Sequence, residues 1–543
     1  MTAAIVVAPA IAGWILWMAA IVRIGLVSAR MFQLEEYDTR RLLRWAWTTP
    51  GWFGHRAALI GALVSWVIAG AGAVRGVHWA VAVAWAVGGV VANVAWRWTP
   101  AKKGLVSTPR VRRLLITAAI LTFVIAAVLW VLVVVASDIN AALAVVVAQS
   151  GLMLIPLLLL IVANALMAPV EGRQRRMFLT SARAKLVRIH PDVIAVAGSY
   201  GKTTTKRILA HLLEGARPTL PTPKSFNTLM GITRTINDDL DERHRAFVVE
   251  MDAYNPGEIA AMCDLVQPRI AVITSVGPQH LERFHSMQRI EDALYEAVDA
   301  LPDDGTAIIH AGDAYSAALA ARARAGGAGA VVYGFDGDAE DLDVVARDVV
   351  VSGDGTSFTW VWKAEQLEER VVVPLLGRHQ ALNATAALAV LHTLGDPLPP
   401  ALRAMADLEA VEHRLQVLPT TNGITVIDDS YNANPVGVHN ALEVLAEVKA
   451  NRRILVTPGL VELGPVEDDE NRRYGVHAAE VCDDVIVVSA RTTEAIVAGL
   501  QAGGLAQDHI HVVGSLDGAT VVIGQVARSG DVVLFANDLP DTY

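Results

Sequence analysis

Two hydrophobic patterns divide the chain near residue 170. Before that point, five long apolar stretches follow one another with charged segments between them, over residues 3–22, 57–74, 77–96, 114–136 and 141–168. A helix of about 20 apolar residues spans the roughly 30 Å hydrocarbon core of a bilayer. The pattern therefore predicts a transmembrane region of about five helices over residues 1–170. Buried core helices are the alternative, and the charged segments between the stretches disfavour it.

The basic residues of this part predict an orientation. Arginine and lysine are frequent after the first, third and fifth stretches, in residues 23–56, 97–113 and 173–185, whereas the other two connections offer Arg75 alone. Because basic loops favour the cytoplasmic side, five spans agree with this distribution if the N-terminus lies outside. We therefore expect a multi-pass protein of the inner (cell) membrane whose C-terminal two-thirds is cytoplasmic.

After residue 190 the pattern changes to short Val/Ile/Ala runs that alternate with amphipathic stretches. This alternation is typical of an α/β fold with a largely parallel sheet and helices on both faces. The segment GDPLPPAL at 395–402 indicates a domain boundary. We expect a basic cytoplasmic linker at 171–190, a central α/β domain at 191–397, and a smaller Rossmann-like α/β domain at 398–543.

Composition narrows the function classes. Of the 543 residues 53% are hydrophobic, and the formal net charge is -10. A net acidic chain of this kind argues against a general nucleic-acid-binding role. The apolar excess lies before residue 170, so a membrane is the expected partner of that part.

The stretch VIAVAGSYGKTTTK at 193–206 predicts a phosphate-binding loop between a strand and a helix. Backbone N–H groups of such a turn, together with the helix dipole, attract phosphates. Lys202 would neutralise the β- and γ-phosphates, and the hydroxyl of Thr203 could bind Mg²⁺. The loop is shorter than the usual P-loop template, because Val196 stands where that template has its first glycine. The residues expected to hold the phosphates are Gly198, Ser199, Tyr200, Gly201, Lys202, Thr203 and Thr204.

Two further polar residues follow predicted strands. Glu250 ends the strand AFVVE, and His280 follows the strand RIAVITSV. In an open parallel sheet, ligands bind beyond the carboxyl ends of the strands. Both residues are therefore candidate catalytic and magnesium-binding groups beside Lys202 and Thr203. Taken alone, Glu250 could equally be a solvated strand end and His280 a loop histidine with structural contacts.

Six motifs in this order resemble the Mur ligase family: GSYGKTTTK, EMDAYNPGEI, ITSVGPQHLERF, LLGRHQALNATAALA, EHRL and IDDSYNANP. The last motif, with GRHQALNATAA, is most similar to the type that adds D-alanyl-D-alanine to a UDP-N-acetylmuramoyl-tripeptide. The resemblance covers residues 190–535, about two-thirds of the chain.

The resemblance implies an ATP- and Mg²⁺-dependent amide-bond ligase. In the family, a substrate carboxylate attacks the γ-phosphate of ATP, and an amine then displaces phosphate from the acyl phosphate. Such chemistry needs positioning and charge neutralisation more than covalent work by the protein. By the family pattern Thr203, Glu250 and His280 serve the magnesium ions and Asn227 lies in a substrate loop. By the same pattern Asn383 lies near the adenine, and Arg414 and Asp429 reach the nucleotide from the last domain. Asn383 could instead simply cap the helix NATAALAVL.

The sequence departs from the family pattern in three places. Leu294 stands where the family usually has a carbamylated lysine that binds metal, and Ser225 and Ser275 replace usual asparagines. Between the last apolar stretch and the phosphate loop there is also no room for a UDP-binding domain. The membrane could replace that domain, because a tethered ligase meets a lipid-linked acceptor at high effective concentration.

We therefore expect a membrane-bound ligase of peptidoglycan precursor synthesis. Its substrates would be a nucleotide- or lipid-linked cell-wall precursor and an amino acid or dipeptide, with D-alanyl-D-alanine favoured. A membrane ligase for another polymer, such as poly-γ-glutamate, is the enzymatic alternative. An NTPase-driven transporter or signalling protein is the alternative of another class. It is disfavoured because the apolar stretches carry no paired intramembrane charges.

Overall fold

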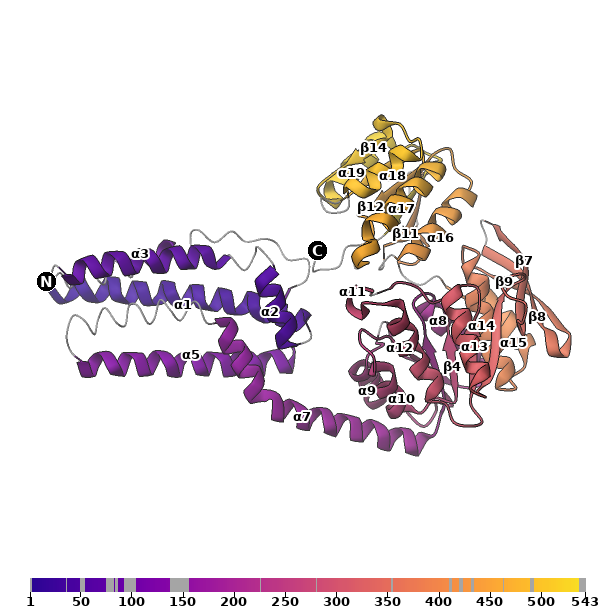
Figure 1. Ribbon diagram of the computed structural model, residues 1–543, viewed down its shortest axis with the longest axis horizontal. Helices are drawn as coiled ribbons and strands as arrows, with labels where there is room; N and C mark the ends of the chain where they lie inside the picture. Colours follow the sequence, from indigo (N-terminus) through magenta and orange to yellow (C-terminus); the bar gives the residue numbers. More distant parts are fainter. Residues whose placement is uncertain are drawn as a thin grey trace. The chain divides into compact units, whose positions relative to one another are not determined.

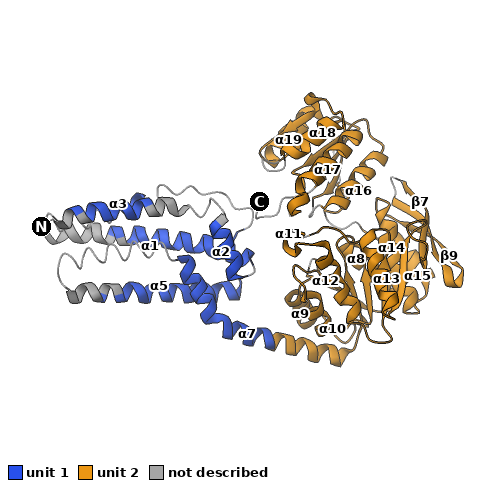
Figure 2. Cartoon of the chain, viewed as in Figure 1, with its two compact units in different colours: residues 1–176 blue, residues 177–543 orange. Residues whose placement is uncertain are grey.

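The computed structural model describes residues 2–35, 37–48, 54–74, 83, 86–91, 104–136, 156–224, 226–279, 281–352, 355–409, 413–418, 423–430, 434–461, 463–488 and 493–536. The chain divides into two compact units, residues 1–176 and residues 177–543 (Figure 2). The first is helical, and the second holds two α/β domains.

The described residues of the first unit include long apolar helices and a short amphipathic helix. These are α1 (Thr2–Leu34), α2 (Thr39–Thr48), α3 (Gly54–Val74), α5 (Pro109–Ala136) and the first part of α7 (Pro156–Ile189). Within the described residues, three helical segments are long and apolar enough to cross a membrane: Ile15–Leu34, Pro109–Val128 and Pro156–Ile189. These segments overlap the first, fourth and fifth stretches expected from the sequence.

The other predicted spans have a mixed outcome. The stretch 57–74 lies within α3, of which Ile60–Ala69 is a shorter apolar helix. The stretch 77–96 lies mostly outside the described residues, as does 141–155 at the start of the fifth stretch. Pro156 is the first residue of α7 that the structure describes.

The expected linker at 171–190 is helical instead. α7 continues without a break from Pro156 to Ile189 and includes Pro169. The apolar residues Ala182, Leu186 and Ile189 of its last turns are buried in the core of the second unit. The basic residues between them are good helix formers, so the end of α7 is an integral part of the second unit.

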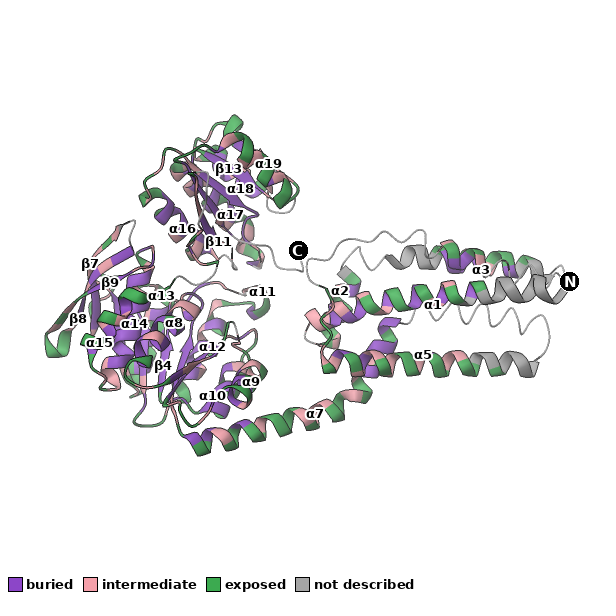
Figure 3. Cartoon of the chain, turned by 180° about the vertical axis from the view of Figure 1, so that it is seen from behind, coloured by how far each residue is buried: buried purple, intermediate pink, exposed green. Residues whose placement is uncertain are grey.

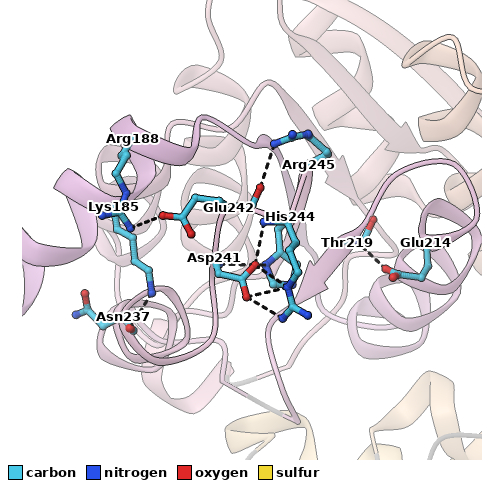
Figure 4. Close-up of polar contacts among 10 residues, drawn as sticks. Lys185, Arg188, Glu214, Thr219, Asn237, Asp241, Glu242, His244 and Arg245 are labelled. Carbon is cyan, nitrogen blue, oxygen red and sulfur yellow. Dashed lines mark hydrogen bonds and ion pairs between the residues drawn. The ribbon is translucent and has the colours of Figure 1, made fainter.

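Polar contacts fasten this end of α7 to its neighbours (Figure 4). The Lys185 ammonium donates to the carbonyl oxygen of Asn237 at 2.9 Å, and the Asn237 amide donates to the carbonyl oxygen of Phe178 at 3.0 Å. Arg188 forms an exposed ion pair with Glu242 at 3.0 Å. The apolar contacts supply most of the stability, because exposed ion pairs contribute little.

The first α/β domain alternates strands and helices. In chain order its elements are β1 (Asp192–Ala197), α8 (Lys202–Glu214), β2 (Thr219–Pro221), α9 (Leu229–Asp238), β3 (Ala246–Glu250), α10 (Glu258–Val266), β4 (Ile270–Ile273), α11 (Leu281–Phe284), α12 (Met287–Asp299), β5 (Thr306–His310), α13 (Ala314–Ala325), β6 (Gly329–Phe335), β7 (Val344–Ser352), β8 (Gly355–Trp362), β9 (Leu367–Val373), α14 (His379–Thr393) and α15 (Leu398–Ala404).

Its strands form one nine-stranded sheet in the order β2-β3-β1-β4-β5-β6-β7-β8-β9. The pairings from β2 to β7 are parallel, and β7-β8-β9 are antiparallel. Successive residues of β1 enter opposite cores: Val193 and Ala195 pack towards α9, α10 and α12, whereas Ile194 and Val196 pack towards α8 and α14. The expected fold, a parallel sheet with helices on both faces, is confirmed (Figure 1).

The domain boundary lies later than the proline-rich segment at 395–402. Leu398 and Ala401 of α15, with Met405 behind them, pack into the second core of the central domain. The next sheet begins at Gln416. The prolines start a helix here rather than a linker, because proline is tolerated in the first turn of a helix.

The last domain is smaller. Its elements are β10 (Gln416–Leu418), β11 (Thr425–Asp429), α16 (Pro435–Glu447), β12 (Arg453–Thr457), α17 (Glu467–Val481), β13 (Asp484–Val487), α18 (Thr493–Ala502), β14 (Ile510–Val512), α19 (Leu516–Val526) and β15 (Val532–Ala536). The six strands are ordered β10-β11-β15-β12-β13-β14, and β10 alone among them is antiparallel to its neighbour. Its strands are largely buried (Figure 3).

Candidate active site

The phosphate loop requires its two glycines. Gly198 and Gly201 have φ angles of 137° and 84°, in the region that favours glycine. A Cβ atom on Gly198 would lie 2.1 Å from Oγ1 of Thr274, and one on Gly201 would lie 2.6 Å from Oδ1 of Asn383. The loop therefore passes too close to β4 and α14 for any other residue.

Part of the loop's hydrogen-bonding capacity is already used. The backbone N–H groups of Ser199 and Tyr200 both donate to the carbonyl oxygen of Ser275, at 2.9 and 3.2 Å. α8 begins at Lys202, and the first N–H groups of a helix have no partner within it. The N–H groups of Lys202, Thr203 and Thr204 are therefore the ones that the fold directs towards an anion.

The side chain of Lys202 is folded back onto its own loop. Its ammonium donates to the carbonyl oxygen of Gly198 at 2.6 Å and to that of Ser199 at 3.3 Å, and to Oε1 of Gln279 at 3.4 Å. It also forms an ion pair with Asp252 at 3.5 Å. The loop thus holds a buried cation close to the start of α8.

Glu250 is fixed by three neighbours. Its carboxylate forms an ion pair with Lys206 at 2.8 Å, and both side chains are only 2% exposed. Its second oxygen accepts from Nδ2 of Asn227 at 3.2 Å, and its backbone N–H donates to Oγ1 of Thr222 at 3.1 Å. Lys206 also donates to the carbonyl oxygen of Lys224 at 2.6 Å, which ties the loop carrying Asn227 to α8.

A cavity of about 360 Å³ collects almost all of the residues expected at the site. From the expected set it is lined by Ser199, Tyr200, Gly201, Lys202, Thr203, Thr204, Asn227, Glu250, Asn383, Arg414 and Asp429. Gly198 lies behind the loop and shapes it without lining the cavity. His280 lies outside the described residues, and so does Ser225.

Asn383 is not a helix cap. α14 begins at His379, so Asn383 lies one turn inside the helix and is 7% exposed. Its Oδ1 accepts from the Thr205 hydroxyl at 3.2 Å, and its Nδ2 donates to Oε1 of Gln380 at 3.1 Å. These contacts hold the amide between α8 and the cavity.

The last domain contributes Arg414 and Asp429 to the same cavity. Burial raises the pKa of Asp429 to about 7, although the charge of Arg414 opposes this shift. On the central domain, burial and the Arg414 charge lower the pKa of His379 to about 4, so this imidazole is neutral at physiological pH. The cavity therefore joins the phosphate loop to ionisable groups of both α/β domains.

The donor set suits a magnesium ion. The hydroxyl of Thr203 and the carboxylates of Glu250 and Asp252 line one cavity, and hard oxygen ligands are those that Mg²⁺ prefers. The described residues contain no group of three or more His, Cys, Asp or Glu that could hold a metal alone. Such a site fits an ion that also takes phosphate oxygens and water as ligands.

Two residues of the site were missed in reading the sequence. Lys206 lies one helical turn after Lys202, and Asp252 lies two residues after Glu250. Residues four apart share one face of a helix, and residues two apart share one side of an extended chain. These spacings could have predicted Lys206 and Asp252 from Lys202 and Glu250. Leu294, by contrast, is 6% exposed and belongs to the hydrophobic core, and it does not line the cavity.

Comparisons with known proteins match both α/β domains. Residues 196–391 match the Mur ligase middle domain, and residues 413–537 match the Mur ligase glutamate ligase domain. A UDP-N-acetylmuramoyl-tripeptide–D-alanyl-D-alanine ligase from Mycobacterium tuberculosis (strain ATCC 25618 / H37Rv) is 30% identical over 389 residues, which cover 65% of this chain and 72% of that protein. The chain belongs to the Mur ligase family. The resemblance seen in the motifs is confirmed.

Other members of the Mur ligase family show the same relationship. The enzyme of that name from Bacillus subtilis (strain 168) is 29% identical over 297 residues, or 54% of this chain. A crystal structure of MurF from Acinetobacter baumannii is similar with a TM-score of 0.60 and 25% identity, covering 67% of this chain and 77% of that one. MurF from Thermotoga maritima in complex with ADP gives a TM-score of 0.58 and 26% identity, covering 67% and 80%.

The match does not extend over whole relatives. The chain covers 62% of the B. subtilis ligase and 66% of its Escherichia coli (strain K12) counterpart. The two α/β domains are thus the shared part, and the apolar helices before α7 lie outside both matched family domains.

Proposed function

We propose that this Mur ligase family member is an ATP-dependent ligase that joins D-alanyl-D-alanine to a muramoyl tripeptide in peptidoglycan precursor synthesis. The observation that carries the proposal is the single cavity in which the phosphate loop, Glu250 and Asn383 of one domain meet Arg414 and Asp429 of the next. The names of the similar proteins support this choice of substrates.

The reaction has two steps. An oxygen of the tripeptide carboxylate bonds to the γ-phosphorus of ATP as the bond to the β-phosphate oxygen breaks, which gives an acyl phosphate and ADP. The amine of D-alanyl-D-alanine then attacks the acyl carbon, loses a proton, and expels phosphate. Both steps need reactants held in place and negative charge neutralised.

The residues of the cavity meet these needs. The N–H groups of Lys202, Thr203 and Thr204 and the positive end of α8 would bind the phosphates, and the Lys202 ammonium would neutralise them. The neutral imidazole of His379 and the amide of Asn383 would contact the adenine. Arg414 would add a positive charge from the last domain.

Magnesium would be held by Thr203 and Glu250 at the position described above, with His280 as a further expected ligand. A bound Mg²⁺ supplies Lewis-acid stabilisation of the charge on the phosphates. Lys206 and Asn227 orient the Glu250 carboxylate for that task.

The proposal includes a membrane. Among the described residues, three apolar helical segments are long enough to span a bilayer, and the last of them continues into the core of the central domain. The basic connections favour an outside N-terminus with cytoplasmic catalysis. The acceptor would then be a lipid-linked precursor, although a nucleotide-linked one would use the same chemistry. Reporters fused to the two ends test the orientation: the one at Met1 should read outside, and the one at Tyr543 cytoplasmic. Two reporters on the same side would contradict five spans.

The test of function uses the full chain in lipid nanodiscs with ATP and Mg²⁺. ADP release should require both the tripeptide acceptor, lipid- or UDP-linked, and D-alanyl-D-alanine, and mass spectrometry should find the pentapeptide product. With ¹⁸O in the acceptor carboxylate, one labelled oxygen should appear in the released phosphate. ATP hydrolysis without either substrate, or ligation of glutamate instead, would contradict the proposal.

A further inference from the structure

Two acid–lysine pairs connect the end of β3 to the start of α8. The inner pair joins Glu250 to Lys206 at 2.8 Å, and the outer pair joins Asp252 to Lys202 at 3.5 Å. Each pair joins one carboxylate to one lysine. The two lysines of α8 therefore neutralise both carboxylates in this part of the cavity.

The spacing of these four residues along the sequence explains the two pairs. Residues four apart on a helix lie on one face, about 5–6 Å from each other. Residues two apart on an extended chain point to one side, about 6.6 Å from each other. Met251, between the two acids, points the other way into the hydrophobic core. Lys202 and Lys206 can therefore face Asp252 and Glu250 one to one.

The two pairs differ in how firmly they are held. In the inner pair both side chains are 2% exposed, and further hydrogen bonds from Asn227 and to Lys224 fix them. In the outer pair the side chains are 7% and 16% exposed, the distance is longer, and both residues line the cavity. The backbone of Asp252 is nevertheless anchored, because its N–H donates to the carbonyl oxygen of Asn227 at 3.0 Å.

The outer pair lies where a bound nucleotide would compete for it. Lys202 is the buried ammonium at the start of α8, and phosphates at that helix end compete with Asp252 for it. Once the lysine turns to the phosphates, the Asp252 carboxylate is left in a partly buried cavity without its counter-charge. Such a charge is costly unless another cation offsets it.

We propose that Asp252 is a second carboxylate ligand of the divalent cation that accompanies the nucleotide, and that Lys202 masks it until the phosphates bind. The inference rests on the proposed function of this cavity as an ATP site. While Asp252 and Glu250 are both paired with lysines, the cavity offers little net negative charge to a free cation. Tight cation binding therefore follows nucleotide binding. In the absence of a cation, the phosphates of the nucleotide have to compete with the Asp252 carboxylate for Lys202.

The test separates these two effects with Asp252→Asn in the full chain. Binding of a fluorescent ADP analogue is measured in EDTA and in a magnesium titration. In EDTA the variant should bind the nucleotide about 3–10-fold more tightly than wild type, because the competing carboxylate is gone. The magnesium concentration for half-maximal stimulation of binding should rise about tenfold or more, because a ligand is lost.

Matched variants complete the design. Asp238→Asn removes an exposed carboxylate of the same domain and should behave as wild type in both titrations. Asp252→Glu keeps the charge and should recover part of the magnesium response. Weaker binding of the Asn variant under both conditions would mean a merely structural role, and unchanged binding under both would mean no role; either result overturns the inference. Failure of the wild type to bind the nucleotide would instead contradict the proposed function.

Discussion

The cavity is built from two halves that handle charge differently. On the central domain, the carboxylates of Glu250 and Asp252 are each matched by a lysine of α8. On the last domain, Asp429 lies near Arg414, but burial outweighs that charge and raises the pKa of the carboxyl to about 7. The carboxylates of one half are neutralised by ion pairs, whereas the Asp429 carboxyl of the other is neutralised by protonation below about pH 7.

This difference follows from the local structure of each half. The central half rests on a nine-stranded sheet with a large hydrophobic core on each face. The last domain reaches the cavity with the end of β11 and a turn in which His413 and Leu415 have positive φ angles of 60° and 45°. We infer that the central half is built before the nucleotide arrives, and that the last domain adds groups that respond to it.

The largest expected effect belongs to the central half. Lys202→Ala should lower ligation about 10³-fold or more, because one preorganised charge on the phosphates is lost. Product formation is followed by mass spectrometry and ADP release. The variant should stay folded, since the pair that it breaks faces the cavity.

A matched control for this variant lies on the same helix. Arg207→Ala removes an exposed cation of α8 and should leave ligation within about twofold of wild type. Wild-type ligation by the Lys202 variant would show that the phosphates bind elsewhere, and the central half would then lose its assigned role.

The second largest effect tests whether the core around Leu294 excludes a charged side chain. Leu294→Lys should lower the free energy of unfolding by about 3 kcal/mol or more, because the core around α12 has no place for an ammonium group. Gln288→Lys places the same charge on an exposed position of α12 and should cost less than about 1 kcal/mol. Thermal unfolding measures both.

The same variant addresses metal binding. Wild type should show no stimulation by bicarbonate, because leucine at 294 cannot form a carbamate. If Leu294→Lys instead stayed stable and lowered the magnesium requirement, the side chain would have to reach the cavity, contrary to its buried position.

The comparison also shows which features the sequence could predict. The phosphate loop and the parallel strands could be predicted from local patterns. A glycine-rich turn with a lysine indicates a phosphate loop, and runs of β-branched residues indicate strands, with little influence from the rest of the fold. Among the residues that line the cavity, Glu250 was predicted because carboxyl ends of parallel strands share one edge. Asn227, Asn383, Arg414 and Asp429 were expected only from the resemblance to the Mur ligase family.

Features that depend on packing could not be predicted in the same way. Predicting Lys206 as the ion-pair partner of Glu250 requires the rotation of α8 about its axis relative to β3. The hydrophobic periodicity of the sequence does not give that rotation. The burial of Leu294 and of α15 depended on which face of the sheet each helix covers. The helical course of residues 171–189 was missed because basic composition indicates exposure but not the absence of structure.

The third effect belongs to the last domain. Arg414→Ala should raise the KM for ATP about tenfold with a smaller change in kcat, because the arginine binds a substrate that the central half already holds. Its removal should also let the pKa of His379 rise, since the Arg414 charge helps to lower it. Arg403→Ala, at an exposed position of α15, is the control. A loss in kcat equal to that of Lys202→Ala would show that both halves are equally required in the reaction.

The smallest effect compares two neighbours in β11 by their pH dependence. Burial raises the pKa of Asp429 to about 7, so the folded state keeps a proton that the unfolded state releases near pH 4. The stability contributed by Asp429 therefore falls as the pH rises from about 4 to about 7. Burial also acts on Asp428, but hydrogen bonds with Ser430 and His413 outweigh it and lower the pKa of that carboxyl. Its contribution is present above its ordinary value and is lost only as the pH falls below it.

Substitution by asparagine should therefore act in opposite directions at the two positions. At pH 8, Asp429→Asn should melt above wild type and Asp428→Asn below it, each by a few degrees, which is about 1 kcal/mol for domains of this size. At pH 5 the advantage of Asp429→Asn should vanish, because wild-type Asp429 is then protonated, while the loss in Asp428→Asn should persist. Thermal midpoints between pH 5 and pH 8 measure both. If the two variants followed parallel curves, the charge of Asp429 would not depend on burial, and the two halves of the cavity would be neutralised in the same way.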